Sequence, residues 1–120
     1  IRNLVQESML TLHDLILPIF IRAPEDSPII PNLPGIQRYT LEELPSFIEE
    51  ISQTGILAVA LFPATPLDLK TENGCEALNP DNLVCEATRR IKALNPELGV
   101  ITDVALDPYT SHGHDGLILN

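Results

Sequence analysis

The apolar residues of the chain gather into three continuous runs, at residues 14–21, 56–63 and 98–106. A run that is apolar at nearly every position is typical of a strand buried on both faces, as in a parallel sheet. Pro18, within the first run, has no backbone N–H to donate to a neighbouring strand. It therefore predicts that this part of the strand is incompletely paired or bulged.

Two segments between these runs have the spacing of amphipathic helices. In residues 40–55, Thr40 and Glu43 match a capping box, and Gly55 is a suitable stop. Residues 79–94 begin with Asn79 as the predicted cap and Pro80 in the first helical position. The residues expected on the inner faces are Leu44, Phe47, Ile48 and Ile51 in the first helix, and Val84, Ala87, Thr88 and Ile91 in the second.

The alternation of strands and helices predicts an α/β fold with right-handed crossovers and a parallel sheet. A doubly wound sheet and a (β/α)8 barrel both satisfy this pattern. Residues 22–39 hold several prolines and are predicted to be a loop. Residues 1–12 are predicted to be an N-terminal arm. Residues 13–120 would then be three strands and two helices of a partial domain, because no helix follows the third strand.

Composition narrows the range of partners. The chain has 120 residues and a formal net charge of -10, which argues against nucleic acid and against anionic membranes as partners. No apolar run is long enough to span a bilayer. The two cysteines, Cys75 and Cys85, lack the spacing of a metal site, so we expect free thiols and a cytoplasmic location.

Most of the candidate chemistry lies in and after the third apolar run. Asp103 falls inside the predicted strand, where a buried carboxylate requires a partner. It could cap a neighbouring loop, but we expect it to point to the mouth of the site. The loop that follows holds Asp107, His112, His114 and Asp115. Three interpretations remain open for this loop: a cation site, a pocket for a polar substrate, and a turn held by its own side chains.

Other catalytic motifs are missing from the sequence. It has no glycine-rich dinucleotide fingerprint, no nucleophile elbow and no Walker motif. Its two lysines, Lys70 and Lys92, are expected to be solvated, because neither lies in an apolar setting that would lower a lysine pKa for Schiff-base chemistry.

Several stretches together resemble the delta-aminolevulinic acid dehydratases, also called porphobilinogen synthases. They are "LTLHDLILPIFI", "NLPGIQRYTLEEL", "FPATPLDLKTENGCEALNPDNLVCEATRRIK" and "PELGVITDVALDPYTSHGHDG", and they cover nearly the whole chain. The resemblance implies the N-terminal part of a (β/α)8 TIM barrel. It also implies condensation of two 5-aminolevulinate molecules to porphobilinogen, in cytoplasmic homo-octamers whose arms clasp a neighbour.

The resemblance also implies roles for individual residues. The family's zinc-binding cysteines are matched here by Ala105, Asp107 and Asp115, so we expect no zinc and a magnesium-responsive enzyme. Asp103 matches an active-site aspartate. The residues expected to bind substrate or a cation are Asp107, Asp115, Ser111 and His114.

Two features of the sequence depart from the family pattern. The Schiff-base lysines and most of the magnesium site lie downstream of the positions matched here, so the 120 residues alone are expected to be inactive. The stretch between "HGHDG" and "ILN" is shorter than is usual in the family. The alternative hypothesis is a non-catalytic fragment that acts only in assembly or binding.

Overall fold

The computed structural model describes residues 1–117 of the chain, without the side chains of Arg2 and Asn3. Its strands are β1 (Leu17–Arg22), β2 (Arg38–Tyr39), β3 (Ala58–Ala64) and β4 (Gly99–Thr102). They form one sheet in the order β2-β1-β3-β4, and every neighbouring pair is parallel. The predicted parallel α/β fold is confirmed.

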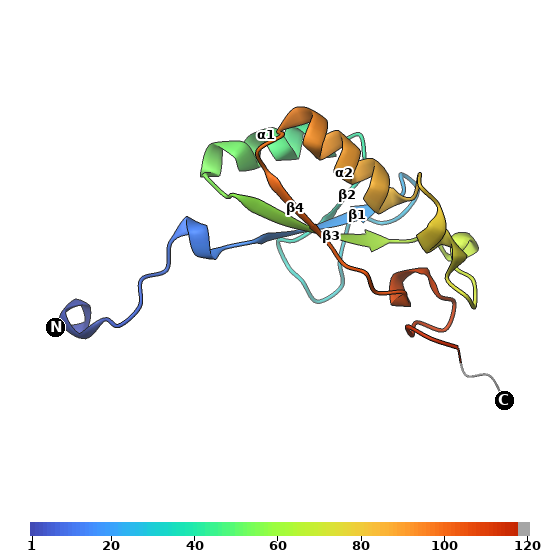
Figure 1. Cartoon of the computed structure of the whole chain (residues 1–120), viewed down its shortest axis with the longest axis horizontal. Helices are drawn as coiled ribbons and strands as arrows, with labels where there is room; N and C mark the ends of the chain where they lie inside the picture. Colours follow the sequence, from blue (N-terminus) through green and yellow to red (C-terminus); the bar gives the residue numbers. More distant parts are fainter. Residues whose placement is uncertain (118–120) are drawn as a thin grey trace.

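Two helices, α1 (Leu44–Thr54) and α2 (Leu83–Leu94), lie together on one face of the sheet (Figure 1). Alternate strand residues point toward them, as the period of two along a strand requires. The side chains that fill this core come from both layers: Ile19, Ile21, Val59 and Leu61 from the sheet, and Leu44, Ile48, Ile51, Val84, Ala87 and Ile91 from the helices. Phe47, also predicted on an inner face, is partly buried and packs against this core, whereas Thr88 is only partly buried.

The opposite face of the sheet has no covering layer within the described part of the chain. Phe20 and Phe62 project there with ring centroids 5.6 Å apart, and Ile101, which pairs with Ala60 of β3, is 46% exposed. An apolar sheet face of this kind is what a barrel encloses. If the sheet closes into a barrel, the helices lie outside it and the two phenylalanines face its interior.

The start of α1 follows the predicted capping box. The Thr40 N–H donates to Glu43 Oε2 over 2.8 Å, and the Glu43 N–H donates to Thr40 Oγ1 over 3.2 Å. Regular helix begins only at Leu44, because the capped residues form a turn before Pro45 enters the first helical turn. Gly55 ends the helix at φ +85°, a left-handed conformation that glycine adopts without strain.

The predicted start of α2 was wrong. Asn82 caps the helix, with its Oδ1 accepting the Cys85 N–H over 2.9 Å. Asn79 instead ends a short 3-10 helix at Cys75–Leu78, and its own Oδ1 accepts the Asp81 N–H over 3.0 Å. Two asparagines three residues apart offered two caps, and the preceding turn uses the first.

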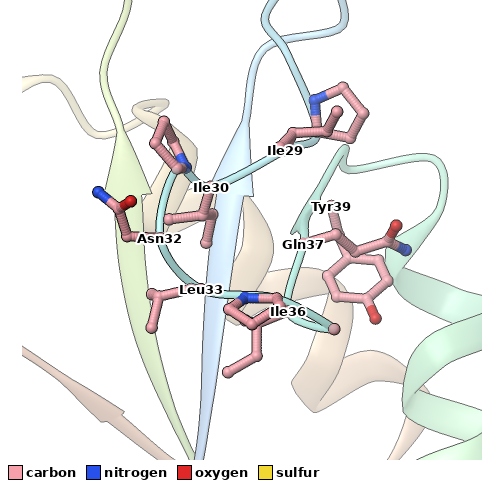
Figure 2. A pocket seen from close by; sticks show the side chains of 11 residues that line it. Ile29, Ile30, Asn32, Leu33, Ile36, Gln37 and Tyr39 are labelled. Atoms are coloured by element: carbon pink, nitrogen blue, oxygen red, sulfur yellow. The ribbon is translucent and has the colours of Figure 1, made fainter.

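Strand β2 was missed, because it is only two residues long and follows a proline-rich loop. It pairs with Phe20 and Ile21 alone, so Pro18 faces β3 on one side and no strand of the described chain on the other. This confirms the incomplete pairing predicted at Pro18. The loop before β2 surrounds a shallow apolar hollow of about 650 Å³, shown in Figure 2.

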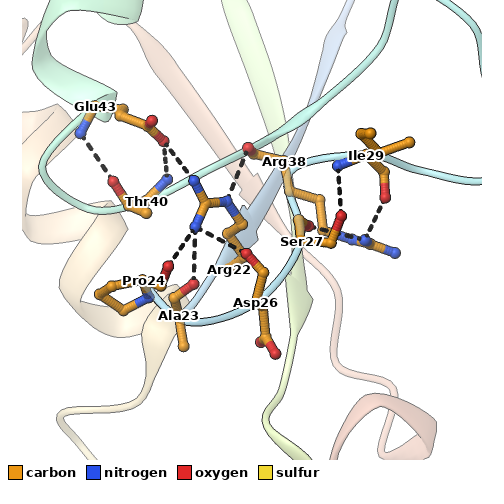
Figure 3. A network of polar contacts seen from close by, with 9 residues as sticks. All are labelled: Arg22, Ala23, Pro24, Asp26, Ser27, Ile29, Arg38, Thr40 and Glu43. Carbon is orange, nitrogen blue, oxygen red and sulfur yellow. Dashed lines mark hydrogen bonds and ion pairs between the residues drawn. The ribbon is translucent and has the colours of Figure 1, made fainter.

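Arg22, at the end of β1, fixes the first part of that loop (Figure 3). Its side chain is 8% exposed, and Nη1 donates to three carbonyl oxygens at 2.9–3.1 Å. The carbonyls belong to Ala23, Pro24 and Asp26. Longer contacts of 3.4 Å reach the Arg38 carbonyl and Glu43 Oε2. One buried guanidinium thus joins β1, the loop, β2 and the turn before α1.

The residues before β1 run away from the sheet (Figure 1). They contain two short 3-10 helices, at Arg2–Val5 and Leu12–Asp14, and expose Leu4, Val5, Met9 and Leu10. Their role as an arm that clasps a neighbour stays a prediction. Within residues 1–117, no helix is long and apolar enough to cross a membrane.

Candidate functional site

Three loops meet at the carboxyl edge of the sheet, where parallel α/β folds bind their ligands. They follow β1, β3 and β4, and together they enclose a hollow of about 460 Å³. Its floor is formed by Phe20 and Phe62, and its polar lining includes Arg38, Lys70 and Asp107. A hollow of this volume, apolar below and charged at the rim, suits a small polar molecule.

The two cations at this hollow differ in how they are held. Arg38 donates through Nη1 to the carbonyls of Ser27 and Ile29, so it is committed to the loop beside β2. Lys70 is partly buried, which corrects the expectation of a fully solvated side chain. Its Nζ has no hydrogen-bond or ion-pair partner within residues 1–117, so this ammonium can pair with an incoming anion. Lys92, by contrast, is exposed and donates to the carbonyls of Pro96 and Leu98.

The side chain of Asp115 holds the backbone at Asp107 in position. Oδ1 of Asp115 accepts the backbone N–H groups of Leu106 and Asp107, over 2.7 Å and 3.0 Å. A carboxylate that receives two amide hydrogens makes a strong local bond. Asp115 therefore closes the loop 103–117 upon itself and leaves the Asp107 side chain at the hollow.

Thr110 is a structural residue of this loop, as expected if the turn is held by its own side chains. It is 3% exposed, and its Oγ1 donates to the His114 carbonyl over 2.9 Å and accepts the His114 N–H over 3.1 Å. The rings of His112 and His114 stack with centroids 5.9 Å apart. His112 Nε2 lies 3.0 Å from the carbonyl oxygen of Glu72, in the loop after β3.

Asp103 does not occupy the position predicted for it. Strand β4 ends at Thr102, so Asp103 lies just beyond it and is exposed rather than buried in a strand. Its Oδ1 accepts the Ala105 N–H over 3.3 Å, and both residues line a separate hollow of about 320 Å³. Ser111 is exposed, and its N–H donates to the carbonyl of Thr71 over 3.0 Å.

Tyr109 packs beneath the loop. It is 8% exposed, and burial raises the pKa of its hydroxyl above the usual value. Cys75 and Cys85 are free, as predicted. The side chain of Cys75 is exposed, whereas that of Cys85 is partly buried.

The predicted site residues form several small groups rather than one cluster. Within residues 1–117, no three His, Cys, Asp or Glu side chains come together in a way that could hold a metal ion. Ala105, Asp107 and Asp115 offer no thiolate for zinc, and Asp115 already spends one oxygen on backbone amides. The described residues therefore do not fit a resident metal by themselves.

Comparison with known proteins places the chain in a family. The family model for delta-aminolevulinic acid dehydratase matches residues 1–120. A curated relative of that name from Bradyrhizobium diazoefficiens is 48% identical over 98% of the chain, and one from Chlamydia pneumoniae is 45% identical over the full chain. The chain spans 33% and 36% of the lengths of these relatives.

A solved structure has the same fold. It is the delta-aminolevulinic acid dehydratase of Toxoplasma gondii in complex with its product porphobilinogen, and it superposes with a TM-score of 0.89. It is 40% identical, and the match covers 98% of this chain and 33% of that one. The fold is therefore the N-terminal part of a TIM barrel, which excludes the doubly wound alternative. The chain belongs to the delta-aminolevulinic acid dehydratase family.

Proposed function

We propose that this chain supplies the N-terminal third of a porphobilinogen synthase, which condenses two 5-aminolevulinate molecules to porphobilinogen and two waters in tetrapyrrole biosynthesis. Family membership supports the reaction. The structural observation that carries the proposal is the hollow at the carboxyl edge of the sheet, where Lys70 and Asp107 face the same space above two aromatic rings. The substrate has an ammonium at one end and a carboxylate at the other, which matches such a lining.

The three aspartates at the edge of the sheet have different roles in this proposal. Asp107 binds the ammonium group of one substrate, directly or through a cation, with Ser111 and His114 nearby on the same loop. Asp115 acts chiefly through its bonds to the loop amides, with Oδ2 left for a ligand. Asp103 faces the reacting substrates once the remaining strands surround it. The lysines that form Schiff bases would lie on later strands of the full-length enzyme, after the residues matched here.

The setting of the enzyme is also proposed from the family resemblance. Magnesium would act on the complete enzyme through ligands outside residues 1–117. Residues 1–12 would clasp a neighbouring subunit in a homo-octamer, which would bury their exposed apolar side chains, Leu4, Val5, Met9 and Leu10 among them. The location would be cytoplasmic.

The test uses the full-length protein, meaning this chain with any sequence that continues it in its gene. Incubation with 5-aminolevulinate should yield porphobilinogen, and borohydride should trap the substrate on lysine as a mass increase. Neither outcome would be seen for a non-catalytic fragment that only assembles or binds, so absence of both overturns the proposal.

Two matched variants test the role of the aspartate. Asp107→Asn should raise the KM for 5-aminolevulinate several-fold, because the ammonium loses a charged partner. Asp68→Asn changes an exposed aspartate in the neighbouring loop and should leave the kinetics unchanged. Replacing Asp107 and Asp115 together with alanine should raise KM further, and unchanged kinetics in the double variant would refute the assignment.

A further inference from the structure

The loops after β3 and β4 are joined directly, although their residues are about forty positions apart. The Thr71 N–H donates to the Tyr109 carbonyl over 3.2 Å, and the Ser111 N–H donates to the Thr71 carbonyl over 3.0 Å. One side chain adds to this backbone junction. The ring of His112 reaches across to the carbonyl of Glu72, the residue after Thr71.

Both ring nitrogens of His112 are in use. Nδ1 accepts the His114 N–H over 3.3 Å, sharing this hydrogen with Thr110 Oγ1 at 3.1 Å, so Nδ1 carries no hydrogen in this arrangement. The neutral ring then has its hydrogen on Nε2, which donates to the Glu72 carbonyl over 3.0 Å. Neither nitrogen keeps a free lone pair for a cation, which argues against His112 as a metal ligand and for a role in holding the loops.

The junction lies next to the residues that line the hollow. Lys70 immediately precedes Thr71, and Gly113 immediately follows His112, and both residues line the hollow with Asp107. A shift of one loop against the other would therefore change the separation of the Lys70 ammonium and the Asp107 carboxylate. These are the two opposite charges that a small zwitterion would meet there.

We propose that His112 is a positioning residue, whose ring fastens the loop after β3 to the loop after β4 and so sets the spacing of Lys70 and Asp107 for a zwitterionic amino-acid substrate. The identity of that substrate rests on the proposed function. The fastening itself rests on the geometry of the two loops.

Four variants of the full-length protein test the kinetic consequence. His112→Ala should raise KM for 5-aminolevulinate about fivefold to tenfold and change kcat less than twofold, because a hydrogen bond that holds the site is lost while no reacting group is removed. His112→Gln keeps an N–H long enough to reach the Glu72 carbonyl and should recover most of the affinity. His112→Asn is too short to reach Glu72 and should resemble alanine. His13→Ala, at an exposed histidine before β1, is the control.

A second readout does not depend on activity. Hydrogen exchange followed by mass spectrometry should show faster exchange at the amides of Thr71, Ser111 and His114 in His112→Ala than in His13→Ala. Unchanged exchange together with unchanged KM would overturn the proposal. A fall in kcat at constant KM, without recovery in His112→Gln, would also overturn it, because His112 would then act in the chemistry. If exchange rises in a protein that makes no porphobilinogen, the fastening is supported and the proposed function fails.

Discussion

Replacing Arg22 with methionine should destabilise the protein far more than the same change at Arg89. Both guanidinium groups donate to backbone carbonyls and pair with carboxylates. They differ in burial, because the Arg22 side chain is 8% exposed and that of Arg89 is 51% exposed. Comparing the two variants therefore shows how burial changes the contribution of an arginine's hydrogen bonds to stability.

The expected loss follows from the contacts of Arg22. Nη1 carries two hydrogens and meets three carbonyl oxygens, so two full hydrogen bonds are the appropriate count. At about 1.5–3 kcal/mol for each bond from a charged donor, their loss amounts to about 3–6 kcal/mol. Methionine avoids the cost of burying a charge, so the lower end, about 3 kcal/mol, is expected. The exposed Arg89 pairs contribute about 0–1 kcal/mol.

Urea unfolding of the full-length protein, followed by circular dichroism, measures both losses. The slope of the transition should stay the same in the two variants, so that the shift in midpoint reports stability alone. If Arg22→Met loses no more than Arg89→Met, the carbonyl network does not stabilise the loop and the reasoning is refuted.

Three further predictions concern the loops and α1. Thr110→Val should lower the free energy of unfolding by about 1 kcal/mol, because the Thr110 hydroxyl bonds both backbone groups of His114. The control, Thr65→Val, should be neutral or slightly stabilising, because the buried Thr65 hydroxyl has no partner within residues 1–117. Urea unfolding compares the two variants. Gly55→Ala should cost about 1–2 kcal/mol in the same assay, because φ there is +85°. The Thr40 backbone N–H, which donates to the Glu43 carboxylate, holds the pKa of Glu43 below its usual value. The ionised Glu43 therefore stabilises the folded protein fully above the ordinary carboxyl pKa, and this stabilisation is lost as the pH falls through the lower pKa of the folded state. Glu43→Gln should flatten this part of the acid dependence in a pH series of unfolding curves.

The pattern of apolar residues predicted the sheet and helices because burial dominates their placement. Ile19, Ile21, Val59 and Leu61 lie in the core as their runs indicated. The capping box at α1 was also predictable, because a threonine and a glutamate three residues apart complete a local set of hydrogen bonds. Local sequence was insufficient at α2, where Asn79 and Asn82 are both suitable caps and the choice depends on the turn before them.

The third apolar run shows where such a prediction fails. It extends to residue 106, yet β4 ends at Thr102, and Val104 is 92% exposed. An apolar residue indicates only that its side chain is buried somewhere in the complete fold. A β-strand also needs a neighbouring strand with which its backbone can form hydrogen bonds. The register of β4 is paired only from Gly99 to Thr102 along β3. Asp103 was therefore placed in a strand by its apolar neighbours and lies outside it.

The candidate site was only partly predictable, for a different reason. Aspartates and histidines in a short loop indicate chemistry, but they do not reveal which side chains hold the loop and which face the ligand. Thr110 was a candidate for holding the turn, but Asp115 was expected to bind a ligand and instead holds the loop through two backbone amides. Lys70 was predicted to be solvated, and its place in the lining of the hollow with Asp107 follows only from the junction between two loops far apart in the sequence.

The networks that stabilise the edge of the sheet also determine the shape of the hollow. Arg22 fixes the loop after β1, which leads to Arg38 at one side of the hollow, and Asp115 fixes the loop that carries Asp107 at the other. Arg22→Met should therefore raise KM for 5-aminolevulinate as well as lower stability. Arg89→Met should change KM by no more than about twofold and the free energy of unfolding by no more than about 1 kcal/mol. Measuring both quantities in both variants separates the two effects. A destabilised Arg22 variant with unchanged KM would mean that the loop after β1 does not shape the binding site.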